Sequence, residues 1–123
     1  MLYPPQDRTP YPRHADSRRA TCLLPDGSYV YVQSPEGTVW ILEDGPHRHP
    51  RVLGDGRSAR YAGDFTVRDG VVTDLTNLSG TFRPDDRAGL LAVADALEAA
   101  SLTLRDGAVR FFPQDGSRPI VLR

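Results

Sequence analysis

Three Asp-Gly pairs restrict the fold of this chain more than any other feature of its sequence. Asp26-Gly27, Asp69-Gly70 and Asp106-Gly107 each separate two short runs of β-prone residues. Asp-Gly favours the positive φ angles of a two-residue type I′ turn, which joins neighbouring antiparallel strands. The sequence therefore predicts three hairpins. Their strands are residues 21–24 with 29–33, 64–67 with 71–75, and 102–104 with 109–112.

The remaining segments predict further strands and one helix. A looser turn at residues 35–37 leads into a strand over 38–42 that is apolar on both faces, with Trp40 expected in the core. Residues 120–122 suit a last strand. Pro84 and the acidic pair after it mark the start of a helix near residues 85–100. We expect an α+β fold, mostly antiparallel β-hairpins that form a curled sheet or half-barrel with this one helix.

The length of 123 residues suits one domain preceded by an arm. Residues 1–18 contain four of the eleven prolines and form a proline-rich, locally basic N-terminal arm. This arm is either a solvated tail or a segment that lies over the core, with Tyr3 and Tyr11 as candidate anchors. Residues 19–123 are expected to form a single β-rich domain.

The composition excludes several classes of chemistry. All fifteen basic residues are arginines, which rules out Schiff-base and P-loop lysines. Cys22 is the only cysteine, so an intrachain disulfide is impossible, and its place in a predicted strand indicates a buried side chain. No apolar run has the length of a signal peptide or a membrane helix, which predicts a cytoplasmic protein without membrane contact.

Residues 43–60 lack strand signals and are rich in Gly, Pro, His and Arg, which indicates a functional loop. Arg48, Arg51, Arg57 and Arg60 lie in it, and guanidinium groups bind carboxylate or phosphate in bidentate fashion. The alternative is that these arginines only balance charge in a chain whose codons favour Arg. His47 and His49 could chelate a metal, but no third ligand is evident, so no metal or cofactor is assigned.

Residues 57–104 resemble a known module. The resemblance rests on Ala62-Gly63, Gly70, Ser79-Gly80 and Pro84, which follow in the order and spacing of that module. It is found in plant calmodulin-binding IQ-motif proteins and in bacterial effector or polymorphic-toxin proteins. The module has His-Ser-Ser and Ser-Gly-His-Tyr motifs, whereas this chain has Gly-Arg-Ser at 56–58 and Ser-Gly-Thr-Phe at 79–82. The resemblance therefore implies a copy without the histidines that could transfer protons.

The sequence favours a non-enzymatic protein-binding module in a bacterial toxin, effector or immunity system. One alternative is a small enzyme or toxin domain that acts on a nucleotide-like or phosphorylated substrate, and a second is nucleic-acid binding through the basic arm. The net charge of −1 disfavours the second. No catalytic residue is assigned, and the partner is a protein or an anionic small molecule. The candidate binding residues are Arg48, Arg51, Arg57, Ser58, Arg60, Ser79, Gly80 and Arg83.

Near the predicted helix, Ser79 and Gly80 have two interpretations. Backbone N–H groups at the approach to a helix N-terminus could bind an anion. Alternatively, Ser79-Gly80 only forms a turn, Phe82 fills the core and Pro84 starts the helix. The sequence leaves both open.

Overall fold

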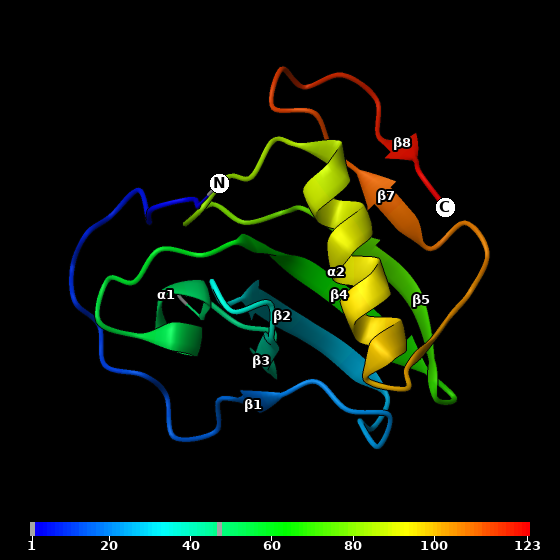
Figure 1. The fold of residues 1–123 in the computed structure, drawn as a ribbon, viewed down its shortest axis with the longest axis horizontal. Coiled ribbons are helices and arrows are strands. Elements are labelled where there is room, and N and C mark those ends of the chain that lie inside the picture. The colour runs from blue at the N-terminus through cyan, green and yellow to red at the C-terminus, as the bar shows by residue number, and fades with distance from the viewer. Residues whose placement is uncertain (1, 47) are drawn as a thin grey trace.

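The structure is a computed structural model that describes residues 2–46 and 48–123. Within these residues the chain forms eight strands in one open sheet and two helices, which confirms the predicted α+β class (Figure 1). The helices are α1 (His49–Leu53) and α2 (Arg87–Ala99). The strands are β1 (Arg18–Arg19), β2 (Gly27–Gln33), β3 (Val39–Glu43), β4 (Tyr61–Arg68), β5 (Val71–Thr76), β6 (Thr103–Leu104), β7 (Val109–Phe111) and β8 (Ile120–Val121).

The predicted hairpin at the second Asp-Gly pair is confirmed. β4 and β5 pair in antiparallel fashion, and Arg68 lies opposite Val71 across a two-residue turn. Asp69 and Gly70 have φ angles of 52° and 76°, the positive values that a type I′ turn requires. β2 and β3 also form the expected antiparallel pair across the turn at residues 34–38.

The prediction for the first Asp-Gly pair is wrong. β2 is bordered by β3 on one side and β4 on the other, so no edge is left for residues 21–24. These residues instead cross from β1, which pairs with the outer edge of β3, to the start of β2. Cys22 is consequently exposed rather than buried. The carboxylate of Asp26 accepts the N–H of Asp69 at 2.8 Å, so this turn fastens the crossing segment to the β4–β5 hairpin.

The prediction for the third Asp-Gly pair is also wrong. β6 and β7 do not pair with each other, because both run parallel to β5. The helix α2 carries the chain from the end of β5 back to its beginning, so the returning strand has the same direction as β5. Asp106-Gly107 interrupts that strand, and Gly107 has a φ of 80°. The sheet is therefore mixed, with an antiparallel majority.

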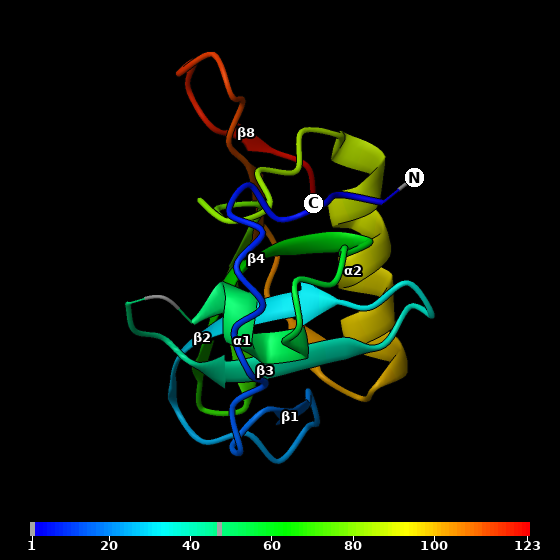
Figure 2. The same cartoon turned by 90° about the vertical axis from the view of Figure 1, so that its left-hand side faces the viewer.

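Two hydrophobic clusters cover the two faces of the sheet. The larger one packs β2, β4 and β5 under α2, and includes Tyr31, Phe65 and Leu97. The smaller one lies on the other face, where Val52 and Leu53 of α1 meet Val32 and Phe82. Figure 2 shows α2 along one side of the sheet. Trp40 is half-buried at the border of the smaller cluster rather than inside it.

Residues 43–60 are not a structureless loop, which corrects the sequence prediction. Their centre forms α1, which has Pro50 in its first turn and buries Val52 and Leu53. These two apolar side chains give the segment a packing face, and that face holds it against β2 and β3. The predicted helix near residues 85–100 is confirmed as α2. Asp86 caps it by accepting the N–H of Gly89 at 2.6 Å.

Candidate functional site

The N-terminal arm lies against α1. The arm donates two hydrogen bonds to carbonyl groups of α1, from His14 N–H to Arg51 at 2.9 Å and from the Ser17 hydroxyl to Val52 at 2.6 Å. The last carbonyl groups of a helix lack partners within the helix, so the arm satisfies groups that α1 leaves free. The N–H of Asp55 donates back to the Tyr11 carbonyl at 2.7 Å. Arm and α1 therefore form one unit.

Gly54 allows this close contact. It follows α1 with φ 80° and ψ 173°, a conformation that essentially only glycine adopts. A Cβ atom there would lie 2.5 Å from the backbone nitrogen of Arg13. The absence of a side chain at Gly54 thus permits the arm to lie directly on the end of α1.

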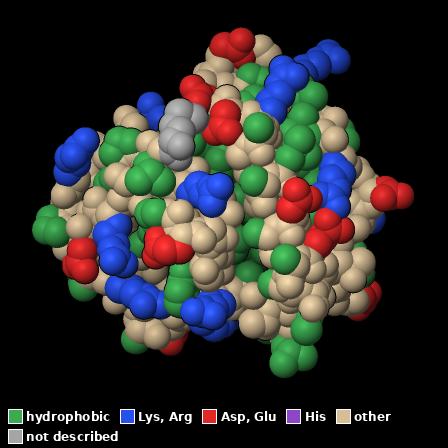
Figure 3. Space-filling model, viewed as in Figure 1, with side chains coloured by type: hydrophobic (Ala, Val, Ile, Leu, Met, Phe, Trp, Pro, Cys, Tyr) green, Lys and Arg blue, Asp and Glu red, His purple; other side chains and the backbone are tan. Residues whose placement is uncertain are grey.

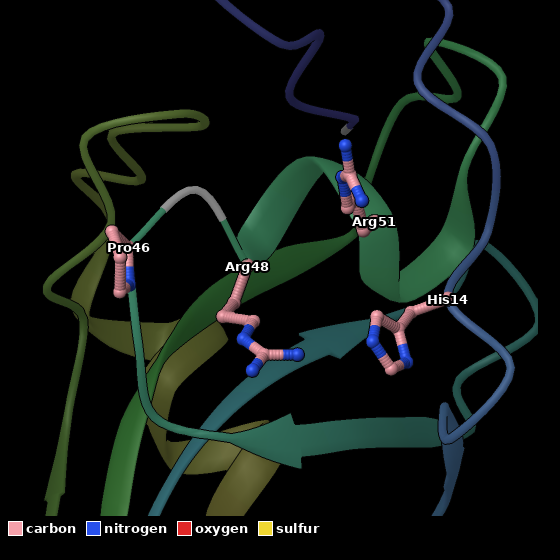
Figure 4. Close-up of a pocket in the computed structure, with 4 residues that line it drawn as sticks. All are labelled: His14, Pro46, Arg48 and Arg51. Carbon is pink, nitrogen blue, oxygen red and sulfur yellow. The ribbon is translucent and has the colours of Figure 1, made fainter.

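A pocket of about 370 Å³ opens between the arm and α1, lined by His14, Pro46, Arg48 and Arg51. In Figure 4 the imidazole of His14 and the guanidinium of Arg48 point toward each other, and Arg51 points away from both. The Nδ1 atom of His14 accepts the N–H of Asp16 at 3.0 Å, which leaves Nε2 to carry a proton. The pocket therefore presents N–H donors from a segment of the arm and from α1.

Three arginines in and around this pocket lie against aromatic rings. The guanidinium carbons of Arg13 and Arg19 lie 4.6 Å and 5.4 Å from the ring centre of Trp40. Arg51 lies 5.7 Å from the ring centre of Tyr11. Such cation–π contacts fix the position of a guanidinium without neutralising its charge. We call the group of Arg13, His14, Arg48 and Arg51 the arm–α1 surface.

The arginines of the arm–α1 surface have no ion-pair partner among the described residues, although carboxylates lie nearby. Among the described residues, Arg13, Arg48 and Arg51 form no ion pair, whereas the neighbouring Arg18 pairs with Glu43 at 2.7 Å. The carboxylate of Asp16 lies 3.8 Å from His14. Figure 3 shows basic side chains gathered on the lower left of the molecule, over the region of the arm, β1 and α1. The surface is therefore suited to bind carboxylate or phosphate groups.

His49 does not belong to this surface. Its Nε2 donates to the carbonyl of Gly63 at 2.7 Å, and burial lowers the pKa of its imidazole. The ring is thus a neutral donor that ties α1 to β4. His47, the other candidate metal ligand, lies outside the described residues. Within residues 2–46 and 48–123 no group of three His, Cys, Asp or Glu side chains could hold a metal ion.

The other predicted binding residues lie in different places. Arg57 and Ser58 line a second pocket with Leu2 and Pro35. Arg60 is exposed and lies beside Gly37, at the turn between β2 and β3. The four arginines of residues 43–60 therefore do not share one surface. Arg48 and Arg51 line the pocket beside His14, whereas the chain beyond Gly54 runs along the beginning of the arm, where Ala59 pairs with Tyr3.

Ser79, Gly80 and Arg83 line a third pocket, near Phe112 and Pro113. The hydroxyl of Ser79 accepts the N–H of Phe82 at 3.2 Å, and Phe82 is buried in the smaller cluster. These contacts match the interpretation of Ser79-Gly80 as a turn. Arg57 and Ser58 lie in another pocket than Ser79 and Arg83, so the structure does not bring these four candidate residues together.

Sequence reasoning missed the part of the surface that the arm supplies. The basic residues Arg13 and His14 were visible in the sequence, but nothing local indicated that they meet α1. Comparison of the chain with protein-family models, with curated proteins and with solved structures finds no match. The resemblance to the effector and calmodulin-binding module therefore stays a prediction. No helix in the described part of the chain has the length and apolar character to cross a membrane.

Proposed function

We propose that the protein is a non-enzymatic interaction module that binds an acidic segment of a partner protein at the arm–α1 surface. The observation that supports this most is that Arg48, Arg51 and His14 line one pocket, without a carboxylate paired to either arginine. Guanidinium groups without an ion-pair partner exchange bound water for charge-assisted hydrogen bonds when a carboxylate arrives.

The surroundings of the pocket favour a peptide segment over a nucleic acid. Tyr11, Trp40 and Pro46 are half-buried or exposed beside the arginines and offer apolar contact to the aliphatic parts of acidic side chains. Asp16 lies 3.8 Å from His14 and Glu43 pairs with the neighbouring Arg18, so carboxylates interrupt the basic surface. Such interruptions would repel a continuous phosphate backbone, whereas an acidic peptide can avoid them.

The proposed biological setting is a bacterial toxin, effector or immunity system. Placement in a bacterial toxin, effector or immunity system rests on the small size of the chain and on the resemblance of residues 57–104. A neighbouring gene that encodes a toxin domain would support an immunity role, and a neighbouring delivery system would support an effector role. The absence of both kinds of neighbouring gene across related genomes would argue against this setting. It would not bear on the binding surface, which the next experiment tests separately.

Affinity capture with three baits tests the binding function. The baits are the wild-type chain, R48Q/R51Q, and the control R60Q/R118Q, which removes two exposed arginines away from the pocket. We expect a stoichiometric protein partner that the wild type and the control retain equally and that R48Q/R51Q loses at least about tenfold. Equal retention by all three baits would contradict the proposal.

A further inference from the structure

A second cationic pocket lies on the sheet, away from the arm. The tripeptide Arg-Asp-Gly occurs twice, at residues 68–70 and 105–107. The topology brings the two copies side by side, because β6 runs parallel to the beginning of β5 and Val71 lies opposite Thr103. The N–H of Arg105 then donates to the carbonyl of Val72 at 2.9 Å. Both arginines are exposed at the same end of the sheet.

The pocket between them measures about 480 Å³ and lies on the sheet face opposite α2. Along β4, Phe65 and Val67 point into the cluster under α2, so Thr66 and Arg68 point to the other face. α1 and its cluster contact β2 and β3 and leave this part of the face uncovered. The side chains that line the pocket are Thr66, Arg68, Thr73, Asp74, Arg105 and Arg110.

The three arginines of this pocket differ in whether they form an ion pair with a carboxylate. Arg110 donates two hydrogen bonds to Asp74, from Nε at 2.7 Å and from Nη2 at 2.9 Å, which occupies both carboxylate oxygens. Nη1 of Arg110 remains available. Arg105 uses Nη2 to donate to the Thr73 carbonyl at 3.1 Å, which holds its guanidinium at the rim. Within the described residues neither Arg68 nor Arg105 forms an ion pair.

We propose that this pocket binds a phosphate group through Arg68 and Arg105, with Nη1 of Arg110 as a third source of donors. Three guanidinium groups at different positions around one opening suit a tetrahedral, doubly charged oxyanion. A planar carboxylate is satisfied by a single guanidinium in bidentate fashion, so it would use only part of this set. The threonine hydroxyls of Thr66 and Thr73 lie at the same opening and add neutral donors. The proposal is independent of the arm–α1 surface, since the two pockets share no residue.

Titration of the ¹⁵N-labelled full chain, followed by NMR, tests this site. The probes are inorganic phosphate, glycerol 3-phosphate and succinate at equal ionic strength. We expect saturable shifts of signals from Arg68, Arg105 and their neighbours with both phosphate probes, and an affinity at least about tenfold weaker for succinate. A higher affinity for glycerol 3-phosphate than for inorganic phosphate would show that the site also contacts the group that bears the phosphate.

Two double variants complete the test, one at the proposed site and one as a control. R68Q/R105Q removes two exposed guanidinium groups and is expected to weaken the phosphate affinity at least about tenfold with an unchanged fold. R48Q/R51Q alters only the other pocket and is expected to bind phosphate here as the wild type does. The proposal is overturned by the absence of saturable shifts at this pocket, by equal binding of succinate, or by equal affinity in R68Q/R105Q.

Discussion

Replacement of Gly54 by alanine should detach the N-terminal arm from α1. The added Cβ would lie 2.5 Å from the nitrogen and 2.8 Å from the Cα of Arg13, and both atoms are backbone. The arm cannot remain in place at these distances. The alanine at position 54 would also be strained, because φ 80° with ψ 173° is a conformation that residues other than glycine reach only with strain.

The cost follows from the contacts that the arm makes there. Strain at Gly54 costs about 1–3 kcal/mol. Release of the arm removes three hydrogen bonds, His14 to Arg51, Ser17 to Val52 and Asp55 to Tyr11, each with a net contribution of about 0.5–1.5 kcal/mol. The two costs do not add in full, because detachment of the arm relieves the steric clash with the new Cβ. We therefore expect G54A to lower the free energy of unfolding by about 2–4 kcal/mol.

Urea denaturation and amide hydrogen exchange measure this effect. G116A is the matched control, since Gly116 has a φ of 81° and no atom within 4 Å of the position of a new Cβ. The control shares the positive φ and the change in the unfolded chain, and is expected to lose only about 1–2 kcal/mol. In G54A the amides of His14 and Asp55 should lose protection. Equal destabilisation of both variants with protected amides would refute the idea that Gly54 seats the arm.

Variants of three further residues test single groups of the structure. Burial lowers the pKa of His49, so the folded protein resists the proton that the unfolded chain takes up below about pH 6.5. Stability should fall from pH 7 to 5 more in the wild type than in H49Q, and equal slopes in urea denaturation would contradict this. Burial raises the pKa of Asp64, so stability is lost as the pH rises above the unfolded value near 3.8 and through the folded pKa. D64N, which can still accept from Thr76, should therefore be more stable than the wild type at pH 7 but not at pH 3. D86A removes the cap of α2 and should cost about 1 kcal/mol in thermal unfolding, whereas D86N should cost less.

Local sequence signals predicted those parts of the fold that depend on neighbours in the chain. The β4–β5 hairpin follows from Asp69-Gly70 alone, and α2 follows from Asp86 and the apolar residues after it. The same dipeptide at Asp106-Gly107 has a different role because α2 returns the chain beside β5. A turn signal states where the chain bends but not which strand it meets next.

The candidate site shows the same limit. Arg48 and Arg51 were predicted as binding residues from guanidinium chemistry, and the structure places both at one pocket. The division of the four arginines was not predictable, because it depends on a short helix that exists through the burial of Val52 and Leu53. The part played by His14 depends on contacts between the arm and α1, which no local pattern encodes.

The central claim is that the arm–α1 surface binds acidic peptide segments. NMR titration of the ¹⁵N-labelled chain with a hexaglutamate peptide and with a hexaserine peptide tests it most directly. We expect saturable shifts at His14, Arg48 and Arg51 with hexaglutamate only, and we expect them to weaken with added salt and to disappear in R48Q/R51Q. Shifts that do not saturate, or that arise equally in R48Q/R51Q, would contradict it.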